Sequence, residues 1–120
     1  MTNIIVRLQV EGLHYWKDAS EVEPDVVFLA NIHRHMFHIK CKAEVRHNDR
    51  DIEFILFKRE IKQYLEDKYF DDSHNCLLFG NRSCEMIAQE LVNEFELNYC
   101  SVAEDGENGA EVIKEKSYEK

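Results

Sequence analysis

The sequence contains no long apolar run, and this absence excludes a membrane-spanning helix, which needs about 20 consecutive apolar residues. Its first residues, Met1 to Arg7, also lack the charged start, long apolar middle and cleavage site of a signal peptide. No repeat with a period of 20 to 50 residues is visible, which argues against a solenoid. We therefore expect a soluble, cytoplasmic protein that has no membrane partner.

Basic residues are in the minority: 15 Lys and Arg stand against 24 Asp and Glu, and the net charge is -9. A field of this sign repels a phosphate backbone, so nucleic acid is not an expected partner. The four cysteines, at positions 41, 76, 84 and 100, form no C-x-x-C pair. This excludes the usual zinc-ribbon and redox motifs and favours reduced thiols that pack as small apolar residues.

Hydrophobic residues make up 44% of the 120 residues, enough to bury a core within one domain. Apolar residues alternate with polar ones over residues 4–14 and again over residues 32–47, which predicts two strands that pair as a hairpin. The residues between them, 16–31, contain the only proline and predict a loop bordering a site. Two further short strands are expected at residues 99–103 and 110–113, around an Asp-Gly turn.

Two amphipathic helices are expected in the middle of the chain. Apolar residues spaced by three and four predict the first from Phe54 to Tyr69 and the second up to about Phe95, with Ser83 as its N-cap. The predicted order is β-β-α-α-β-β, an α+β fold whose antiparallel sheet is covered by helices on one face. Residues 1–113 form the expected domain, and residues 114–120 a charged tail.

Three of the six histidines lie within one hexapeptide that runs from His33 to His38. Residues two apart on a strand share a face, so His33 and His35 project together, whereas His38 points to the other side. His14, at the end of the preceding strand, can join this pair and complete three ligands of a zinc site with an open fourth position. The alternative is that the histidine pair lies on an ordinary solvated strand face; His38 and His47 are expected to bind no metal.

Four segments resemble the 6-pyruvoyltetrahydropterin synthase and 6-carboxytetrahydropterin synthase family. They are His14 with the motif His33-Arg34-His35-Met36-Phe37, the segment Asp51-Ile52-Glu53-Phe54-Ile55-Leu56-Phe57-Lys58, the segment Ser83-Cys84-Glu85-Met86-Ile87-Ala88, and the segment Val102-Ala103-Glu104-Asp105-Gly106-Glu107-Asn108. The resemblance implies the T-fold, in which subunits join around a tunnel as a homo-oligomer: a trimer, tetramer or hexamer. It also implies zinc as cofactor, bound by His14, His33 and His35.

The same resemblance implies that Glu104 anchors a pterin or purine-like ring. A carboxylate can accept two parallel N–H bonds from the edge of a guanine-like heterocycle, and such charge-assisted pairs are strong. Glu104 can equally be an ordinary acidic residue before a turn. Glu85 is a second candidate for ligand binding, although it can be a helix-start carboxylate, as Glu53 can.

The sequence departs from the family pattern at residues that matter for catalysis. Leu29 stands where the family has its catalytic cysteine, and Arg34 replaces the glycine between the paired histidines. The adjacent Asp-His pair of the inter-helix connector has only an imperfect counterpart in Asp72 and His74, which are separated by Ser73. One hypothesis is a zinc-dependent lyase or isomerase in which His74 and Asp72 shuttle the proton. Two others remain: a binding protein that sequesters or senses a nucleotide-like ligand, and an interaction scaffold without ligand.

Overall fold

The computed structural model describes residues 1–114, so the predicted tail lies outside the described residues except for Lys114. The elements follow one another as β1 (Thr2–His14), α1 (Ala19–Val22), the 3-10 helix η1 (Pro24–Ala30), β2 (His33–Val45), α2 (Phe54–Tyr69), β3 (Phe70–Asp71), β4 (Cys76–Gly80), α3 (Cys84–Phe95), β5 (Tyr99–Glu104) and β6 (Asn108–Ile113). The predicted α+β class is confirmed, and each predicted strand and helix is present with small changes of its ends.

The six strands form one sheet in the order β3-β4-β1-β2-β5-β6. Strands β1 and β2 pair antiparallel over their full length, from Thr2 opposite Val45 to His14 opposite His33. The sheet differs from the expected four strands because β3 and β4 lie in the segment that was predicted to be a connector. Strand β4 pairs parallel to the end of β1, beginning at Gly12 opposite Leu77.

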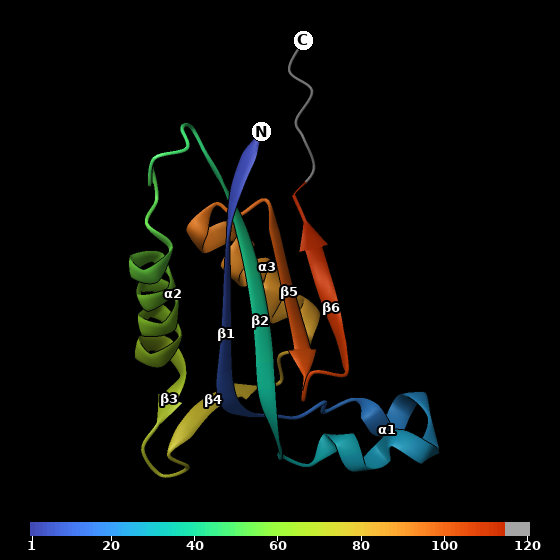
Figure 1. Cartoon of the computed structure of the whole chain (residues 1–120). Helices are drawn as coiled ribbons and strands as arrows, with labels where there is room; N and C mark the ends of the chain where they lie inside the picture. Colours follow the sequence, from blue (N-terminus) through green and yellow to red (C-terminus); the bar gives the residue numbers. More distant parts are fainter. Residues whose placement is uncertain (115–120) are drawn as a thin grey trace.

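Helices α2 and α3 pack on the same face of the sheet, as the periodicity predicts (Figure 1). Alternate residues of β1 and β2, such as Val6 and Ile39, form one cluster with Ile61 of α2 and Leu91 of α3. Ser83 caps α3 as predicted by accepting the Met86 N–H, and Glu53 accepts the Leu56 N–H at the start of α2. Burial of this apolar stripe fixes the register of the sheet.

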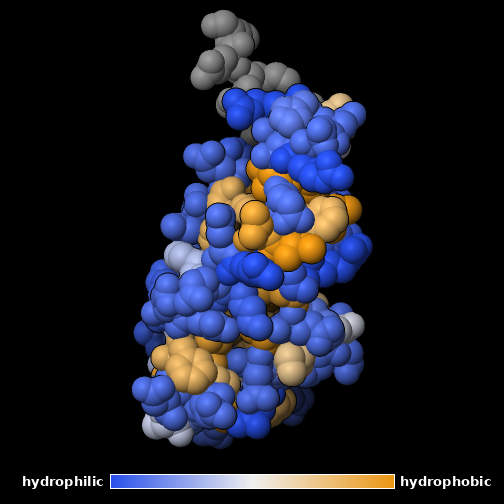
Figure 2. Space-filling model, turned by 60° about the vertical axis from the view of Figure 1, so that its left-hand side comes forward, coloured by the Kyte–Doolittle hydropathy of each residue, from blue (hydrophilic) through white to orange (hydrophobic). Residues whose placement is uncertain are grey.

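Some apolar side chains remain at the surface. A space-filling view turned toward α2 shows a mostly hydrophilic face with an apolar area in its upper half (Figure 2). In the first turn of α2, Phe54, Ile55 and Leu56 are each 55% exposed. Among residues 1–114, no helix has the length and apolar character needed to cross a membrane.

Candidate metal centre and adjoining cavity

Four side chains from three neighbouring strands meet at one end of the sheet, on the face that carries the helices. They are His14 of β1, His33 and His35 of β2, and Glu104 of β5, and one ligand atom from each lies within 4.8 Å of the others. His14 and His33 are cross-strand partners, and Glu104 pairs with Phe37 of β2. The predicted grouping of the three histidines is confirmed, and Glu104 joins it.

Each of the three imidazole rings is held at Nδ1 by an oxygen atom. Nδ1 of His14 lies 2.9 Å from the Arg82 carbonyl, Nδ1 of His33 lies 2.8 Å from the Asn31 carbonyl, and Nδ1 of His35 lies 2.7 Å from Oδ2 of Asp105. A carbonyl or an ionised carboxylate can only accept, so each Nδ1 carries the proton. In a neutral ring with its proton on Nδ1, Nε2 is the nitrogen whose lone pair is available to a metal.

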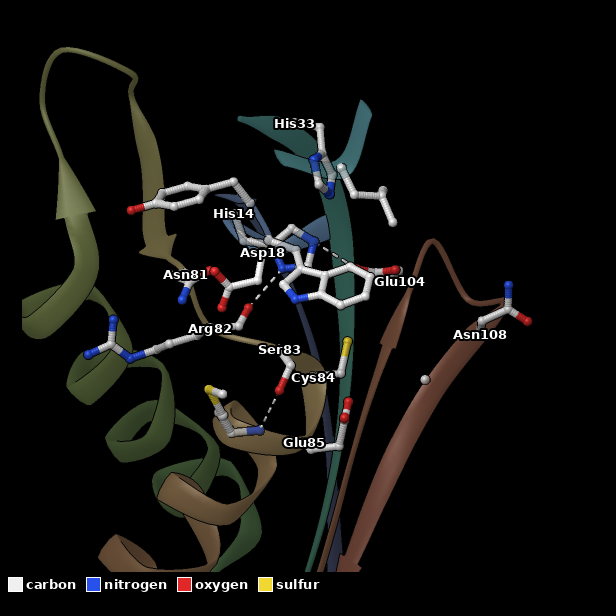
Figure 3. A pocket seen from close by; sticks show the side chains of 15 residues that line it. His14, Asp18, His33, Asn81, Arg82, Ser83, Cys84, Glu85, Glu104 and Asn108 are labelled. Carbon is white, nitrogen blue, oxygen red and sulfur yellow. Dashed lines mark hydrogen bonds and ion pairs between the residues drawn. The ribbon is translucent and has the colours of Figure 1, made fainter. Parts of the chain in front are cut away.

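The Nε2 atom of His14 is buried and makes no hydrogen bond to any residue in the described part of the chain. Oε2 of Glu104 nevertheless lies 2.7 Å from it (Figure 3). The same oxygen lies 3.4 Å from Nε2 of His35. Two lone-pair acceptors at such a distance repel each other unless a cation binds to both, and this cation can be a proton or a metal ion. Burial, the largest effect, lowers the pKa of His14, and His33 and His35 add to this. The Arg82 carbonyl and the Glu104 carboxylate raise it but do not outweigh burial, so the pKa stays below its usual value and the neutral ring is favoured.

This donor set suits zinc. Three imidazole nitrogens with one open position form the usual catalytic zinc site, and a carboxylate oxygen is an acceptable fourth ligand. Ligand atoms about 2.0–2.1 Å from a tetrahedral ion lie roughly 3.3 Å apart. The present atoms spread over up to 4.8 Å, so the most widely separated pair must approach by up to about 1.5 Å to hold a tetrahedral ion.

The aromatic ring of Phe37 packs against two of the three histidine rings. Its centroid lies 5.2 Å from the His14 ring and 5.8 Å from the His35 ring. On the adjacent strand, a Cβ atom at Gly12 would lie only 2.7 Å from the Phe79 ring and 3.0 Å from the Phe37 ring. Glycine at position 12 thus allows both rings to pack closely beneath the histidines.

A cavity of about 580 Å³ opens beside the group. His14, His33 and Glu104 form one side of it, and Trp16 and Leu29 contribute apolar surface. Its polar lining comes from the loops, the start of α3 and the start of β6 (Figure 3): Asp18, Asn81, Arg82, Ser83, Glu85 and Asn108. An apolar wall with a few polar groups is typical of a small-molecule site.

Two residues of the cavity bear on catalysis. Leu29, which stands at the position of the family's cysteine, lines the cavity and offers no proton-transfer group. Cys84 also lines it, but burial and then the carboxylates of Glu104 and Glu85 raise the pKa of its thiol to about 12. Neither residue supplies a base or a thiolate near neutral pH.

The remaining predicted site residues lie in two places. Glu85 lines the cavity from the first turn of α3. His74 lies in the turn between β3 and β4 and pairs through Nδ1 with Asp71, not with the expected Asp72. The reason is the turn itself: Asp71 begins it, and its backbone oxygen accepts the N–H groups of His74 and Asn75. His74 and Asp72 are not among the residues that line the cavity.

Several functional contacts were not foreseen from the sequence. Asp105 accepts from both His35 Nδ1 and the Met36 backbone N–H, and the Arg82 and Asn31 carbonyls hold the other two imidazoles. A backbone carbonyl that accepts a hydrogen bond cannot be recognised from the type of amino acid that provides it. The position of Asp105 directly after Glu104, in an Asp-Gly turn, was the one available signal.

Comparison with known proteins gives a fold but no function. No protein-family model and no curated protein matches the chain. Among solved structures, it resembles the crystal structure of an uncharacterized protein from Wolinella succinogenes, with a TM-score of 0.57 and 12% sequence identity. The match covers 95% of this chain and 98% of the other. At this identity the likeness shows that the two chains share their fold across nearly their whole length.

Proposed function

We propose that the chain binds zinc through His14, His33 and His35 and holds a pterin- or purine-like molecule in the adjoining cavity, with Glu104 as anchor of its ring. The observation that carries the proposal is the convergence of three Nε2 lone pairs whose Nδ1 atoms are all held by oxygen acceptors. Such outer partners orient metal-binding histidines in proteins generally. The resemblance to the 6-pyruvoyltetrahydropterin synthase family gives the identity of the ligand class.

The cavity supports this ligand class in size and chemistry. A volume of about 580 Å³ is within the range of about 300–1,000 Å³ that small-molecule sites occupy. Trp16 gives an aromatic surface for a flat ring, while the carboxylates of Asp18, Glu85 and Glu104 favour a ring edge rich in N–H donors. A guanine-like or pterin edge carries such donors.

Ligand binding is the function that the geometry supports best. Leu29 and the protonated Cys84 leave the cavity without the cysteine thiolate that the resemblance would require for proton transfer, and His74 lies in the β3–β4 turn. The second candidate is a lyase of the 6-pyruvoyltetrahydropterin synthase type, favoured by a three-histidine set with a position open to substrate. Bound zinc would act there as a Lewis acid on a substrate oxygen.

Metal analysis tests the zinc site. Chelator-treated protein, reloaded with zinc and freed of excess, is expected to hold about one ion per chain by native mass spectrometry. His33→Ala and His35→Ala should each lose this ion, because each variant has only two of the three nitrogen ligands left. His38→Ala and His47→Ala serve as matched controls and should retain it. Absence of zinc from the reloaded wild type, or loss from the controls alone, contradicts the proposal.

Calorimetric titration of the zinc-loaded protein tests the ligand class. Neopterin and guanosine should bind more tightly than adenosine, whose ring edge places an acceptor where Glu104 needs a donor. Turnover of a dihydropterin in the same sample would favour the lyase, and binding with recovery of the unchanged compound would favour the binding protein. Equal affinity for the three compounds would contradict the assignment of the ring anchor.

A further inference from the structure

A second hollow, of about 570 Å³, is lined mainly by strand residues that alternate with the buried ones and so point away from the core, together with one residue of α2. Side chains of β1, β2, β5 and the start of α2 line it, and those with polar or charged groups are Arg7, Gln9, His38, Lys40, Lys58 and Ser101. Among the described residues 1–114, none that lines it carries a carboxylate. This is unexpected in a chain of net charge -9, where acidic residues outnumber basic ones by 24 to 15.

Two of the cationic residues in this lining, Arg7 and Lys40, lie directly opposite each other in the sheet. Arg7 and Lys40 are direct cross-strand partners of β1 and β2, which puts their Cβ atoms about 4.5–5.5 Å apart. Like charges in this position destabilise a sheet. On the other side of β2, Lys40 faces Ser101, a neutral residue. The fold thus tolerates a repulsive pair in the middle of its longest strands.

The surroundings neutralise this charge only weakly. None of the ion pairs within residues 1–114 involves Arg7, Lys40 or Lys58. Lys40 Nζ lies 5.9 Å from the centroid of the Tyr99 ring, at the outer limit of a cation–π contact. An uncompensated cluster in a hollow, maintained against its own repulsion, favours an anionic occupant.

We propose that this hollow binds a compact polyphosphate group, meaning a chain of two or more linked phosphates. Three permanent cations match the charge of such a group, and Gln9 and Ser101 add neutral hydrogen-bond donors. An extended nucleic acid is disfavoured, because the rest of the chain carries the opposite charge. Free polyphosphate and the phosphate tail of a nucleotide share this chemistry. The proposal does not depend on the metal centre, whose group lies on the other face of the sheet.

Thermal unfolding and calorimetry test the proposal, with EDTA present so that metal chelation contributes nothing. Tripolyphosphate should raise the Tm by several degrees more than sodium chloride of equal ionic strength. ATP and GTP distinguish the sources: a shift equal to that of tripolyphosphate indicates recognition of the phosphates alone, and a larger one indicates a nucleotide. No shift beyond that of sodium chloride for any of the three overturns the proposal.

Substitutions locate the site. Arg7→Gln and Lys40→Gln should each weaken tripolyphosphate binding at least tenfold, and without the anion their Tm should equal or exceed that of the wild type because the repulsive pair is gone. Lys62→Gln, on the exposed surface of α2, is the matched control and should bind as the wild type does. Equal tripolyphosphate affinity in the Arg7, Lys40 and Lys62 variants would overturn the assignment.

Discussion

The carboxylate of Asp105 accepts two hydrogen bonds from β2, and these connect the turn after β5 to the histidine cluster. Oδ2 accepts from His35 Nδ1, and Oδ1 accepts from the Met36 N–H at 3.0 Å. Its own backbone N–H donates to the Met36 carbonyl, and its φ of 56° is in the left-handed region. The carboxylate therefore sets both the tautomer and the orientation of the His35 ring.

We expect Asp105→Asn to weaken zinc affinity about tenfold to a hundredfold, because a neutral amide holds and polarises the His35 ring less than a carboxylate does. Asparagine tolerates a left-handed backbone, so the turn should survive the change. Competition with a chelating dye measures the affinity, and the Tm of the metal-free variant reports on folding. Glu107→Gln in the same turn is the control; equal zinc affinity in both variants would contradict this role of Asp105.

Glu104 has two possible roles that one substitution separates. Its Oε2 lies 2.7 Å from His14 Nε2, yet the proposed function makes it the anchor of a ring. We expect Glu104→Gln to retain one zinc per chain, because the three histidines remain, and to lower neopterin affinity by about 2 kcal/mol by opposing N–H to N–H. Mass spectrometry and calorimetry give the two values. Loss of zinc with no separate loss of ring binding would instead make Glu104 a metal ligand.

At the residue scale, most of the histidine site could be predicted from the alternation of side chains between the two faces of a strand. This alternation placed His33 and His35 on one face and His38 on the other, and the hairpin brought in His14 as the cross-strand partner of His33. The local spacing of Asp72 and His74 could not reveal that the turn selects Asp71 as the partner of His74. Such contacts depend on backbone geometry that residue identity does not encode.

Helices α2 and α3 are joined by one carboxylate, that of Glu90. It accepts from Tyr64 at 2.7 Å, from Lys68 at 2.9 Å and from Tyr69. Burial alone would raise the pKa of Glu90, but hydrogen bonds from Tyr69, Tyr64 and Lys68 outweigh burial and hold it below the usual value. The ionised form therefore stabilises the folded state.

Glu90→Gln should lower the free energy of unfolding by about 1–3 kcal/mol at neutral pH, because three donors lose a charged acceptor. The folded pKa is lowered, so this contribution is complete above the unfolded pKa of about 4.3 and is lost as the pH falls through the folded value. The difference between wild type and variant should shrink accordingly in urea titrations. Glu94→Gln, exposed on α3, is the control. A difference that persists unchanged at pH 3 would contradict the charge argument.

At the element scale, the sequence predicts the elements that have a clear period. In β1 and β2, apolar and polar residues alternate. In α2 and α3, apolar residues recur every three to four positions. Strand β4, Cys76–Gly80, has no alternation because most of its residues are buried in a continuous apolar run. Its parallel pairing with β1 is a long-range contact that local pattern cannot show.

At the scale of the whole molecule, strand β6 is an outer strand of the sheet that residues 1–114 form, and its far edge is unpaired within that range. Lys114 N–H donates to the Asn98 carbonyl, and antiparallel alternation then directs the N–H groups of residues 109, 111 and 113 away from β5. The apolar first turn of α2 adds exposed surface at Phe54, Ile55 and Leu56. Open edges and exposed apolar surface favour pairing with a second copy of the chain.

We therefore predict a closed homo-oligomer in which β6 pairs with a strand of the neighbouring subunit, as the resemblance to T-fold proteins implies. Sedimentation should give a multiple of the 14.3 kDa chain. Glu111→Pro removes one outward N–H but no bond to β5, so it should release a folded monomer with unchanged circular dichroism, whereas Glu111→Ala should remain assembled. A wild type that stays monomeric at every concentration would contradict the assembly. An oligomer that survives the proline would place the contact on another surface, and the apolar turn of α2 is then the next to substitute.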